Sequence, residues 1–322
     1  MSGSAFERKF GERYALAGLL VSGSLVAIPG EILPAWGYHI TPDFSAIAHH
    51  FLGVTGGLLA GVGLARKSLA HWAIRHTLVI GCAAALAALL GLAFAAPPVH
   101  WRWRVLGLSG LGIAVGFVNT AFFHAVSPAF RRDPARTVSI GGALFGVGSL
   151  IATLLIAAAL RGYSLRTLFV TIALVPAVLA AVFVRTRFAD EPLPPRRPWQ
   201  DILADFTNPG AVLFTLLLFF QFGNEWTIAS WLTLFLIQRL GISPTSALLV
   251  LAVYWAALTG GRVLAQWGLA YISHWRLLIG SGAGALLGCL VLVMTNNRFG
   301  AMLGVLLTGF SFAAIYPLLA ER

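Results

Sequence analysis

Long apolar stretches alternate with short polar connectors along almost the whole chain. Crossing roughly 30 Å of hydrocarbon takes about 20 helical residues, and in lipid only helices or closed barrels satisfy every backbone polar group. The stretches are too long and too uniformly apolar for the alternating strands of a barrel, so the pattern indicates helices. It predicts ten transmembrane helices, at residues 14–36, 44–64, 77–96, 105–126, 138–160, 168–184, 211–237, 246–269, 277–294 and 301–319.

The composition supports the same class. Of the 322 residues, 58% are hydrophobic and only 10% are charged, which is more apolar surface than a water-soluble core can bury. We therefore expect an all-α, polytopic membrane protein. Arg8, Lys9 and Arg13 precede the first stretch as in a signal peptide, but that stretch is too long and lacks a small-residue cleavage pattern, so we expect it to be a mature span.

The net charge of +11 first suggests a nucleic-acid partner, but the predicted topology gives it another meaning. With the amino terminus inside, sixteen of the 22 basic residues fall on inner segments. Such a bias is the positive-inside rule, so the charge reports orientation. We expect a multi-pass protein of the plasma membrane with both termini cytoplasmic and no nucleic-acid partner. The six outer basic residues are Arg102, Arg104, Arg161, Arg166, Arg239 and Arg298.

A connector rich in proline and arginine, residues 185–208, separates six predicted spans from four. It predicts an N-terminal six-helix bundle at 1–184, a cytoplasmic linker at 185–208 and a C-terminal bundle at 209–322, of which four helices are present. Because transporters are often built from internal repeats, we compared the two parts. If both halves had six spans, the second would need two more, which favours a chain truncated after the tenth span.

A shift of 199 residues aligns the two parts without a gap. It places the small residues Gly53, Gly57 and Gly61 on Ala252, Ala256 and Gly260. Small residues four apart form one stripe on a helix and let helices approach closely in lipid. We therefore expect the same packing stripe at the same place in both halves.

Two acidic residues fall inside apolar spans, Glu31 in the first and Glu225 in the seventh. Ionisable residues at membrane depth are costly and are functional candidates by default. A carboxyl group there can bind and release a proton and couple that event to a conformational change. Pro29, Gly30 and Pro34 are expected to interrupt the first helix and to free backbone groups for a solute. The alternative is an acid near the interface that stays wet.

Polar and aromatic side chains in the same spans are candidate ligands for a small solute. Amides suit hydroxyl groups because they both donate and accept hydrogen bonds, and aromatic rings supply a stacking face. Contacts between helices are the alternative for Asn119 and His124, and packing or exposure to lipid is the usual role of aromatic side chains at helical spacing. The candidates for substrate binding are Asn119, His124, Gln221, Asn224, Trp226, Trp231 and Tyr254, the last followed by Trp255.

Enzyme and cofactor signatures are missing from the sequence. No zinc site, P-loop or nucleophile elbow is visible, and Cys82 and Cys289 each lie within an apolar span. His49 and His50, at the start of the second span, are typical of an interface more than of a metal site. We expect neither a metal nor a cofactor nor an enzymatic activity.

Several short motifs resemble the major facilitator superfamily, and within it the fucose permease-like branch of sugar and proton symporters. E-I-L-P from Glu31 resembles that branch's first-helix motif, in which the acid carries the proton. G-F-V-N-T-A resembles the fourth-helix motif, with Asn119 where members often have glutamate. F-G-N-E, ending at Glu225, and the nearby Trp231 resemble the seventh-helix pattern, which implies solute contact.

Two further motifs concern gating and the later helices. G-G-R, ending at Arg262, resembles the eighth-helix motif, and F-A-A-I-Y-P, ending at Pro317, resembles that of the tenth. The superfamily's loop motif between the second and third helices is degraded here: Arg66, Lys67 and Arg75 are present without its aspartate. The resemblance implies gating roles for Arg66 and Arg262; positive-inside anchoring is an equal alternative for Arg262.

Together these observations favour a monomeric carrier of major facilitator type with two pseudo-symmetric bundles. It is expected to move a small polar solute, a monosaccharide first of all, by alternating access with proton coupling through Glu31 and Glu225. Two alternatives stay open: export of amphipathic or drug-like compounds, and a truncated membrane protein that transports nothing.

Overall fold

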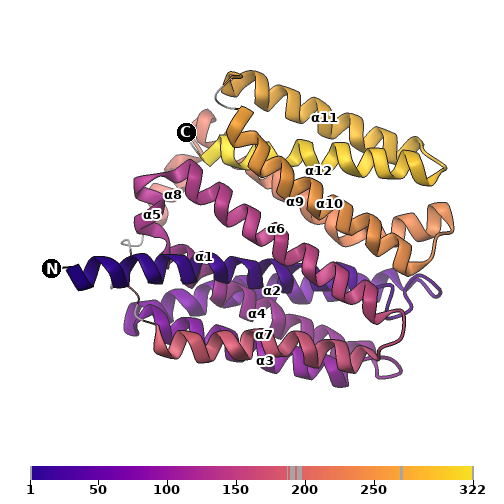
Figure 1. Cartoon of the computed structure of the whole chain (residues 1–322), viewed down its shortest axis with the longest axis horizontal. Coiled ribbons are helices and arrows are strands. Elements are labelled where there is room, and N and C mark those ends of the chain that lie inside the picture. Colours follow the sequence, from indigo (N-terminus) through magenta and orange to yellow (C-terminus); the bar gives the residue numbers. More distant parts are fainter. Residues whose placement is uncertain (1, 187, 189–192, 194–197, 269–270, 321–322) are drawn as a thin grey trace.

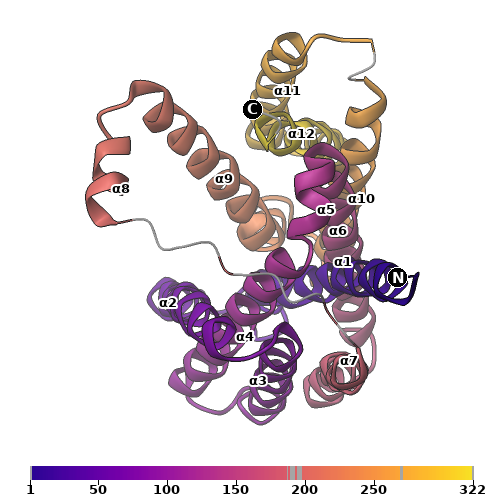
Figure 2. The ribbon, with the colours of Figure 1, turned by 90° about the vertical axis from the view of Figure 1, so that its left-hand side faces the viewer.

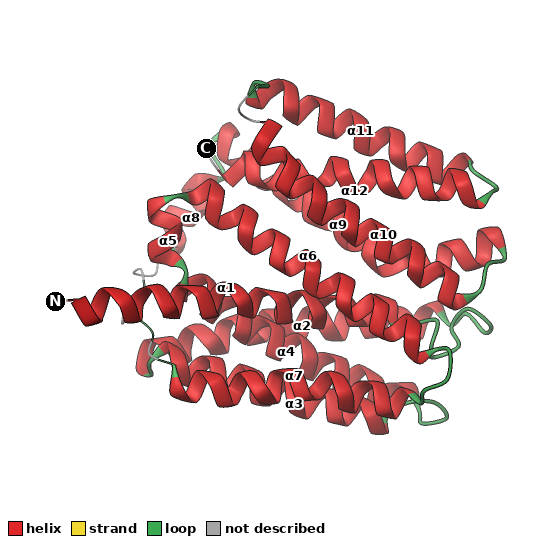
Figure 3. Ribbon diagram, viewed as in Figure 1, coloured by secondary structure: helices red, strands yellow, loops and turns green. Residues whose placement is uncertain are grey.

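The described residues form a helical membrane protein, as expected. A computed structural model describes residues 2–186, 188, 193, 198–268 and 271–320. Within these residues, ten helices are long and apolar enough to cross a membrane (Figure 3). They are α1 (Ser2–Glu31), α2 (Phe44–His71), α3 (Ile74–Phe94), α4 (Trp101–Ala125), α6 (Pro134–Ala159), α7 (Leu165–Arg185), α9 (Pro209–Leu240), α10 (Pro244–Gly268), α11 (His274–Met294) and α12 (Arg298–Ala320). The short helices α5 (Ser127–Arg132) and α8 (Trp199–Asp205) lie in connectors and were not predicted.

The first helix differs from the expectation in two ways. The predicted interruption at Pro29 and Gly30 is wrong, because α1 continues through both residues. The helix then ends at Glu31 instead of residue 36, and residues 32–40 form successive turns. Pro34 disfavours helical geometry at the residue before it, and Gly37 has a positive φ of 82°, which glycine adopts without steric strain. Glu31 therefore lies at the junction between a helix and a turn.

The long helices form two groups, each with its own apolar core. One core draws mainly on α1, α2, α3, α4, α6 and α7, and the other mainly on α9 to α12. In Figure 1 the first group lies below the second, and α1 begins at the same end of the molecule as α12 ends. The two-bundle architecture predicted from the sequence is therefore confirmed.

Helix α6 joins the two groups. It packs against α1 on one side and against α10 on the other, as the end-on view in Figure 2 shows. The contact with α1 is close: a Cβ added to Gly148 would lie 1.7 Å from the carbonyl oxygen of Leu20. The contact with α10 is also close, since a Cβ added to Gly146 would lie 2.2 Å from the Thr259 hydroxyl. Side chains on α6 can therefore reach both groups.

The glycine stripe on α2 packs as predicted. A Cβ on Gly57 would lie 2.1 Å from the carbonyl oxygen of Ser109, and one on Gly61 would lie 2.3 Å from that of Ile113, both on α4. Backbone meets backbone here, so glycine is required at both positions.

The expected counterpart on α10 is displaced by one residue. Ala256 is exposed, and the close contacts with α12 involve its neighbours: Gly261 faces Ala313, and Ala257 faces Gly309. Each of these residues lies 200 positions after its counterpart in the α2–α4 contact, so the structural repeat has an offset of 200 there, and the offset of 199 is wrong for this stripe. Apolar helices align at several shifts, and only the contacts identify the correct one.

Candidate functional site

Glu31 is fully buried among three helices. Its Oε1 atom accepts hydrogen bonds from the Thr153 hydroxyl on α6 and from the indole N–H of Trp255 on α10, the latter at 3.1 Å. Its Oε2 atom has no hydrogen-bond partner among the described residues. The carboxyl group is therefore surrounded by protein. Oε1 accepts two hydrogen bonds, and Oε2 accepts none from the described residues.

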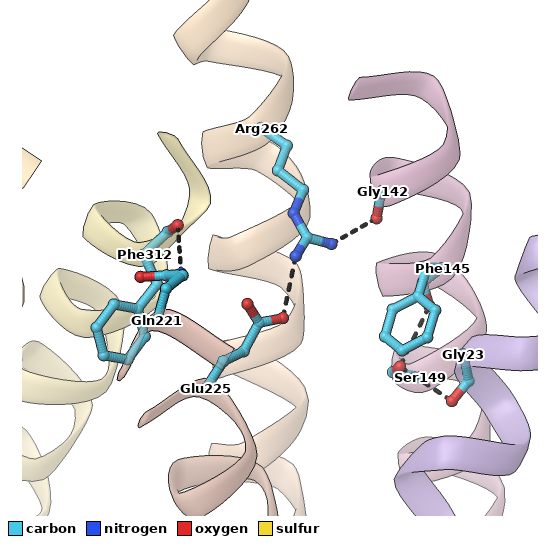
Figure 4. Close-up of polar contacts among 8 residues, drawn as sticks. All are labelled: Gly23, Gly142, Phe145, Ser149, Gln221, Glu225, Arg262 and Phe312. Carbon is cyan, nitrogen blue, oxygen red and sulfur yellow. Dashed lines mark hydrogen bonds and ion pairs between the residues drawn. The ribbon is translucent and has the colours of Figure 1, made fainter. Parts of the chain in front are cut away.

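Glu225 forms a buried ion pair with Arg262 (Figure 4). The Nη2 atom of Arg262, on α10, lies 3.0 Å from Oε1 of Glu225, on α9. The Nη1 atom of the same guanidinium donates to the carbonyl oxygen of Gly142 on α6 at 2.6 Å. Both charged side chains are less than a tenth exposed. Because the guanidinium is planar and has several fixed donors, it can bind both oxygens at once.

Both networks cross from one helix group to the other. Glu31 belongs to the first group and binds Trp255 of the second, while Arg262 belongs to the second and binds Gly142 of the first. A further hydrogen bond joins α6 and α10: the Ser139 hydroxyl donates to the Arg262 carbonyl oxygen at 3.3 Å. Glu31 therefore bonds across the boundary between the groups directly, and Glu225 is connected to it through Arg262.

Two of the proposed solute ligands lie beside these networks. Gln221, one helical turn before Glu225, donates to the carbonyl oxygen of Phe312 on α12 at 3.2 Å (Figure 4). Tyr254 is fully buried beside Trp255, with ring centroids 5.4 Å apart, and its hydroxyl has no hydrogen-bond partner among the described residues. Both side chains are thus buried within the protein, Gln221 with a hydrogen bond to α12 and Tyr254 with an unpaired hydroxyl.

The other sequence-derived candidates are more scattered. Asn119 accepts a hydrogen bond from the Ser22 hydroxyl of α1, which is a contact between helices. Trp231 is half-buried and contacts Phe51 of α2 with tilted rings whose centroids are 5.7 Å apart. Four further candidates are His124 and Trp226, which are half-buried, and Asn224 and Arg66, which are exposed.

No sequence signal identified the residues that hydrogen-bond to Glu31. Thr153 lies in an apolar stretch, where a threonine commonly bonds its own helix, and its hydroxyl also donates to the Ser149 carbonyl oxygen at 2.8 Å. Trp255 was considered only as a stacking face. Gly142 acts through its carbonyl oxygen, which every residue carries, so no sequence signal could have identified it.

The histidine pair lies away from the two acids. His50 is buried, with ring centroids 5.5 Å from Trp36 and 5.6 Å from Tyr38, and His49 bonds the Ser45 carbonyl oxygen through Nδ1 at 2.6 Å. Across the part of the chain that the structure describes, no group of three or more His, Cys, Asp or Glu residues is placed to hold a metal ion.

Comparison with known sequences finds a matching family profile and a relative. The sequence profile of the Major Facilitator Superfamily matches residues 125–321. An uncharacterised transporter of this type from Yersinia pestis is 27% identical over 111 residues. That alignment covers 34% of this chain and 29% of the relative, so less than a third of the relative's length is matched.

Comparison with solved structures extends over nearly the whole chain. A D-xylose–proton symporter superposes with a TM-score of 0.72 at 18% identity, covering 95% of this chain and 80% of that one. The xylose transporter XylE of E. coli, in a partially occluded inward-open state, gives 0.72 at 16%, covering 96% and 85%. The transporter FucP in its outward conformation gives 0.64 at 16%, covering 95% and 83%. At these identities the likeness concerns the fold.

Proposed function

The chain belongs to the major facilitator superfamily, and from that premise we propose that it is a secondary carrier. In this proposal it moves a small polar solute, a monosaccharide first of all, together with protons, by alternating access between the two helix groups. The observation that carries the proposal is the pair of buried carboxyl groups whose hydrogen-bond networks cross from one group to the other.

The geometry at Glu31 supports a proton-binding role. Its Oε2 atom is buried and has no partner among the described residues, so a proton can be added there while Thr153 and Trp255 keep their bonds to Oε1. Loss of that proton leaves a charge in a site walled by protein, which is costly unless donors or water approach. Protonation and helix rearrangement are then coupled at this residue.

Glu225 supports a second coupling step. Protonation of this carboxylate removes the charge that pairs with Arg262, and the guanidinium also holds Gly142 on α6. A change of charge on α9 is thereby passed to the contact between α10 and α6. In this mechanism Arg262 is a gating residue at the contact between the two groups. Arg66, in the last two turns of α2, is proposed as a second gating residue.

The proposed solute is neutral and rich in hydroxyl groups. Gln221, Tyr254, Asn119 and Asn224 offer donors and acceptors without net charge, which suits hydroxyls. His124, Trp226 and Trp231 complete the proposed set, the two indoles as stacking faces. The fold shared with a D-xylose–proton symporter is a further reason to begin with monosaccharides. We also propose that the carrier is a monomer in the plasma membrane with both termini cytoplasmic.

Transport in proteoliposomes tests the proposal. The full chain is reconstituted, and accumulation of labelled D-xylose and D-glucose is measured with and without an inward proton gradient. We expect the gradient to raise accumulation of at least one sugar. Glu31→Gln is expected to remove the response to the gradient and to keep sugar exchange in its absence. Asp201→Asn, which removes an exposed carboxylate on α8, is the control and should behave like the parent.

Three outcomes oppose parts of the proposal. Normal gradient-driven accumulation by Glu31→Gln removes Glu31 from the mechanism. Thermal stabilisation by amphipathic compounds and by no sugar favours export of such compounds. Absence of any uptake by a stable, monodisperse reconstituted chain favours the non-transporting alternative.

A further inference from the structure

A separate pocket lies at the end of the bundle where α1 ends, which is the outer end in the predicted topology. The turns after α1, the residues before α2 and the start of α4 enclose a cavity of about 430 Å³. Its walls include Trp36, Tyr38, Asp43, Trp101 and Arg104. Neither Glu31 nor Glu225 lines it, so it is distinct from the site described above.

Three buried side chains that line this outer pocket have unpaired polar atoms. The indole nitrogen of Trp36, the hydroxyl of Tyr38 and Nε of Arg104 have no hydrogen-bond partner among the described residues, although these side chains are only 5%, 6% and 8% exposed. Buried polar groups in proteins are nearly always paired, so such a cluster points to a ligand. Burial raises the pKa of Tyr38 above its ordinary value, so the phenol keeps its proton and can donate.

The positive charge of the buried Arg104 indicates which ligand charge the pocket favours. Its guanidinium carbon lies 5.3 Å from the centroid of the Trp36 ring and 5.5 Å from that of Tyr38, and Nη2 makes one long bond of 3.5 Å to the Val99 carbonyl oxygen. No carboxylate of the described chain lies within ion-pair distance of it. A buried cation without a counterion is costly, so an anion at this position is favoured and a quaternary ammonium group is not.

The rim of the outer pocket carries one acid. Asp43 is exposed, and its Oδ1 accepts the backbone N–H of Ala46 at 2.9 Å as the cap of α2. Its charge is therefore partly engaged and faces solvent. The rings of His49 and His50 lie 5.1 and 6.5 Å from the ring of Trp101 by their centroids, and neither histidine lines the pocket.

We propose that this outer pocket binds the carboxylate of a small organic acid with an apolar or aromatic body. The guanidinium fork of Arg104 matches a carboxylate in two-point geometry, and the N–H of Trp36 and O–H of Tyr38 are further donors to it. The rings of Trp36 and Trp101 cover the apolar body. The pocket would act as a binding site on the outer face and is independent of the proposed sugar transport.

Calorimetry on the full chain in detergent tests this site with benzoate, and with its neutral amide, benzamide, as the matched ligand. We expect benzoate to bind at least tenfold more tightly than benzamide. Arg104→Gln should weaken benzoate binding at least tenfold, and Tyr38→Phe, which removes only the unpaired hydroxyl, should weaken it severalfold. The control Arg161→Gln removes the same charge from an exposed residue between α6 and α7 that does not line the pocket, and it should bind like the parent.

Folding of each variant is checked by its elution volume and thermal unfolding midpoint. Equal binding of benzoate and benzamide, absence of benzoate binding, or parental benzoate affinity in a folded Arg104→Gln variant would each overturn the proposal. Loss of benzoate binding in Arg161→Gln as well would also overturn it, because the effect would then be one of general surface charge. Sugar uptake is measured in parallel, and its presence or absence does not bear on the result.

Discussion

Arg262 and Glu225 form a buried ion pair between α10 and α9, with 3.0 Å between Nη2 and Oε1. The same guanidinium binds the carbonyl oxygen of Gly142 on α6. One cation thus connects three helices from both groups. Its removal and the removal of its counterion are therefore expected to have different effects, which can be separated by mutation.

Glu225→Gln is expected to lower the thermal unfolding midpoint of the purified chain. The change leaves Arg262 buried without a counterion, and breaking a buried ion pair in this way typically costs about 3–5 kcal/mol. The double variant Glu225→Gln/Arg262→Gln leaves no unpaired charge and should lose less than the sum of the two single changes. An unchanged midpoint for Glu225→Gln, measured by differential scanning fluorimetry, would contradict the structure at this pair.

Thr153→Val removes one donor to Glu31 with little change in shape, and Trp255→Phe removes the other donor together with part of a buried ring. Hydrogen bonds to charged groups contribute roughly 1.5–3 kcal/mol, so each change should reduce proton-driven accumulation in the proteoliposome assay. Because both donors bind Oε1, the effects should not add in a double-mutant cycle. Thr171→Val on α7 is the control, since the Thr171 hydroxyl bonds only its own helix at Thr167 and is exposed. Additive effects would mean that the donors act separately.

Gly57→Ala should destabilise the protein, whereas Gly56→Ala should not. A Cβ on Gly57 would lie 2.1 Å from a backbone oxygen of α4, and a Cβ on Gly56 meets nothing within 4 Å. Overpacking typically costs about 1–3 kcal/mol, and backbone atoms have little freedom to move away. The unfolding midpoints of the two variants test the difference. Equal midpoints would show that α2 and α4 are not in close contact.

Gly30→Ala should separate α1 from α9 near the end of α1. A Cβ on Gly30 would lie 2.5 Å from the Cα atom of Ser230. In a background without Cys82 and Cys289, a cysteine at position 230 should react faster with a maleimide once Gly30 is replaced. Gly223→Ala is the control, because a Cβ there meets nothing within 4 Å. Unchanged labelling by Gly30→Ala would place the two helices further apart than described.

The number of long helices and their approximate bounds were predictable because hydrophobic length is a local property of the sequence. The course of α1 was not. Proline at position 29 predicted an interruption, but proline removes only one backbone donor there, and α1 stays continuous while it packs against α6 and α9. The repeat was visible in the sequence, while its offset depended on which side chains touch across α10 and α12.

The candidate site was predictable only in part, for a similar reason. The two acids stand out because charge is rare in apolar spans. Their partners do not: Thr153 lies 122 positions and Trp255 224 positions from Glu31 along the chain. Hydroxyls, indoles and carbonyl oxygens are common in membrane helices, and the fold alone selects which of them approach a carboxyl group.

The glycine contacts also limit how the molecule can move. Between α2 and α4, and again between α10 and α12, backbone touches backbone with no side chain in between that could change rotamer. We therefore expect the two helices of each pair to move together as one rigid body. In the proposed alternating access, the larger displacements fall instead at the contacts of α6 with α10 and of α1 with α9.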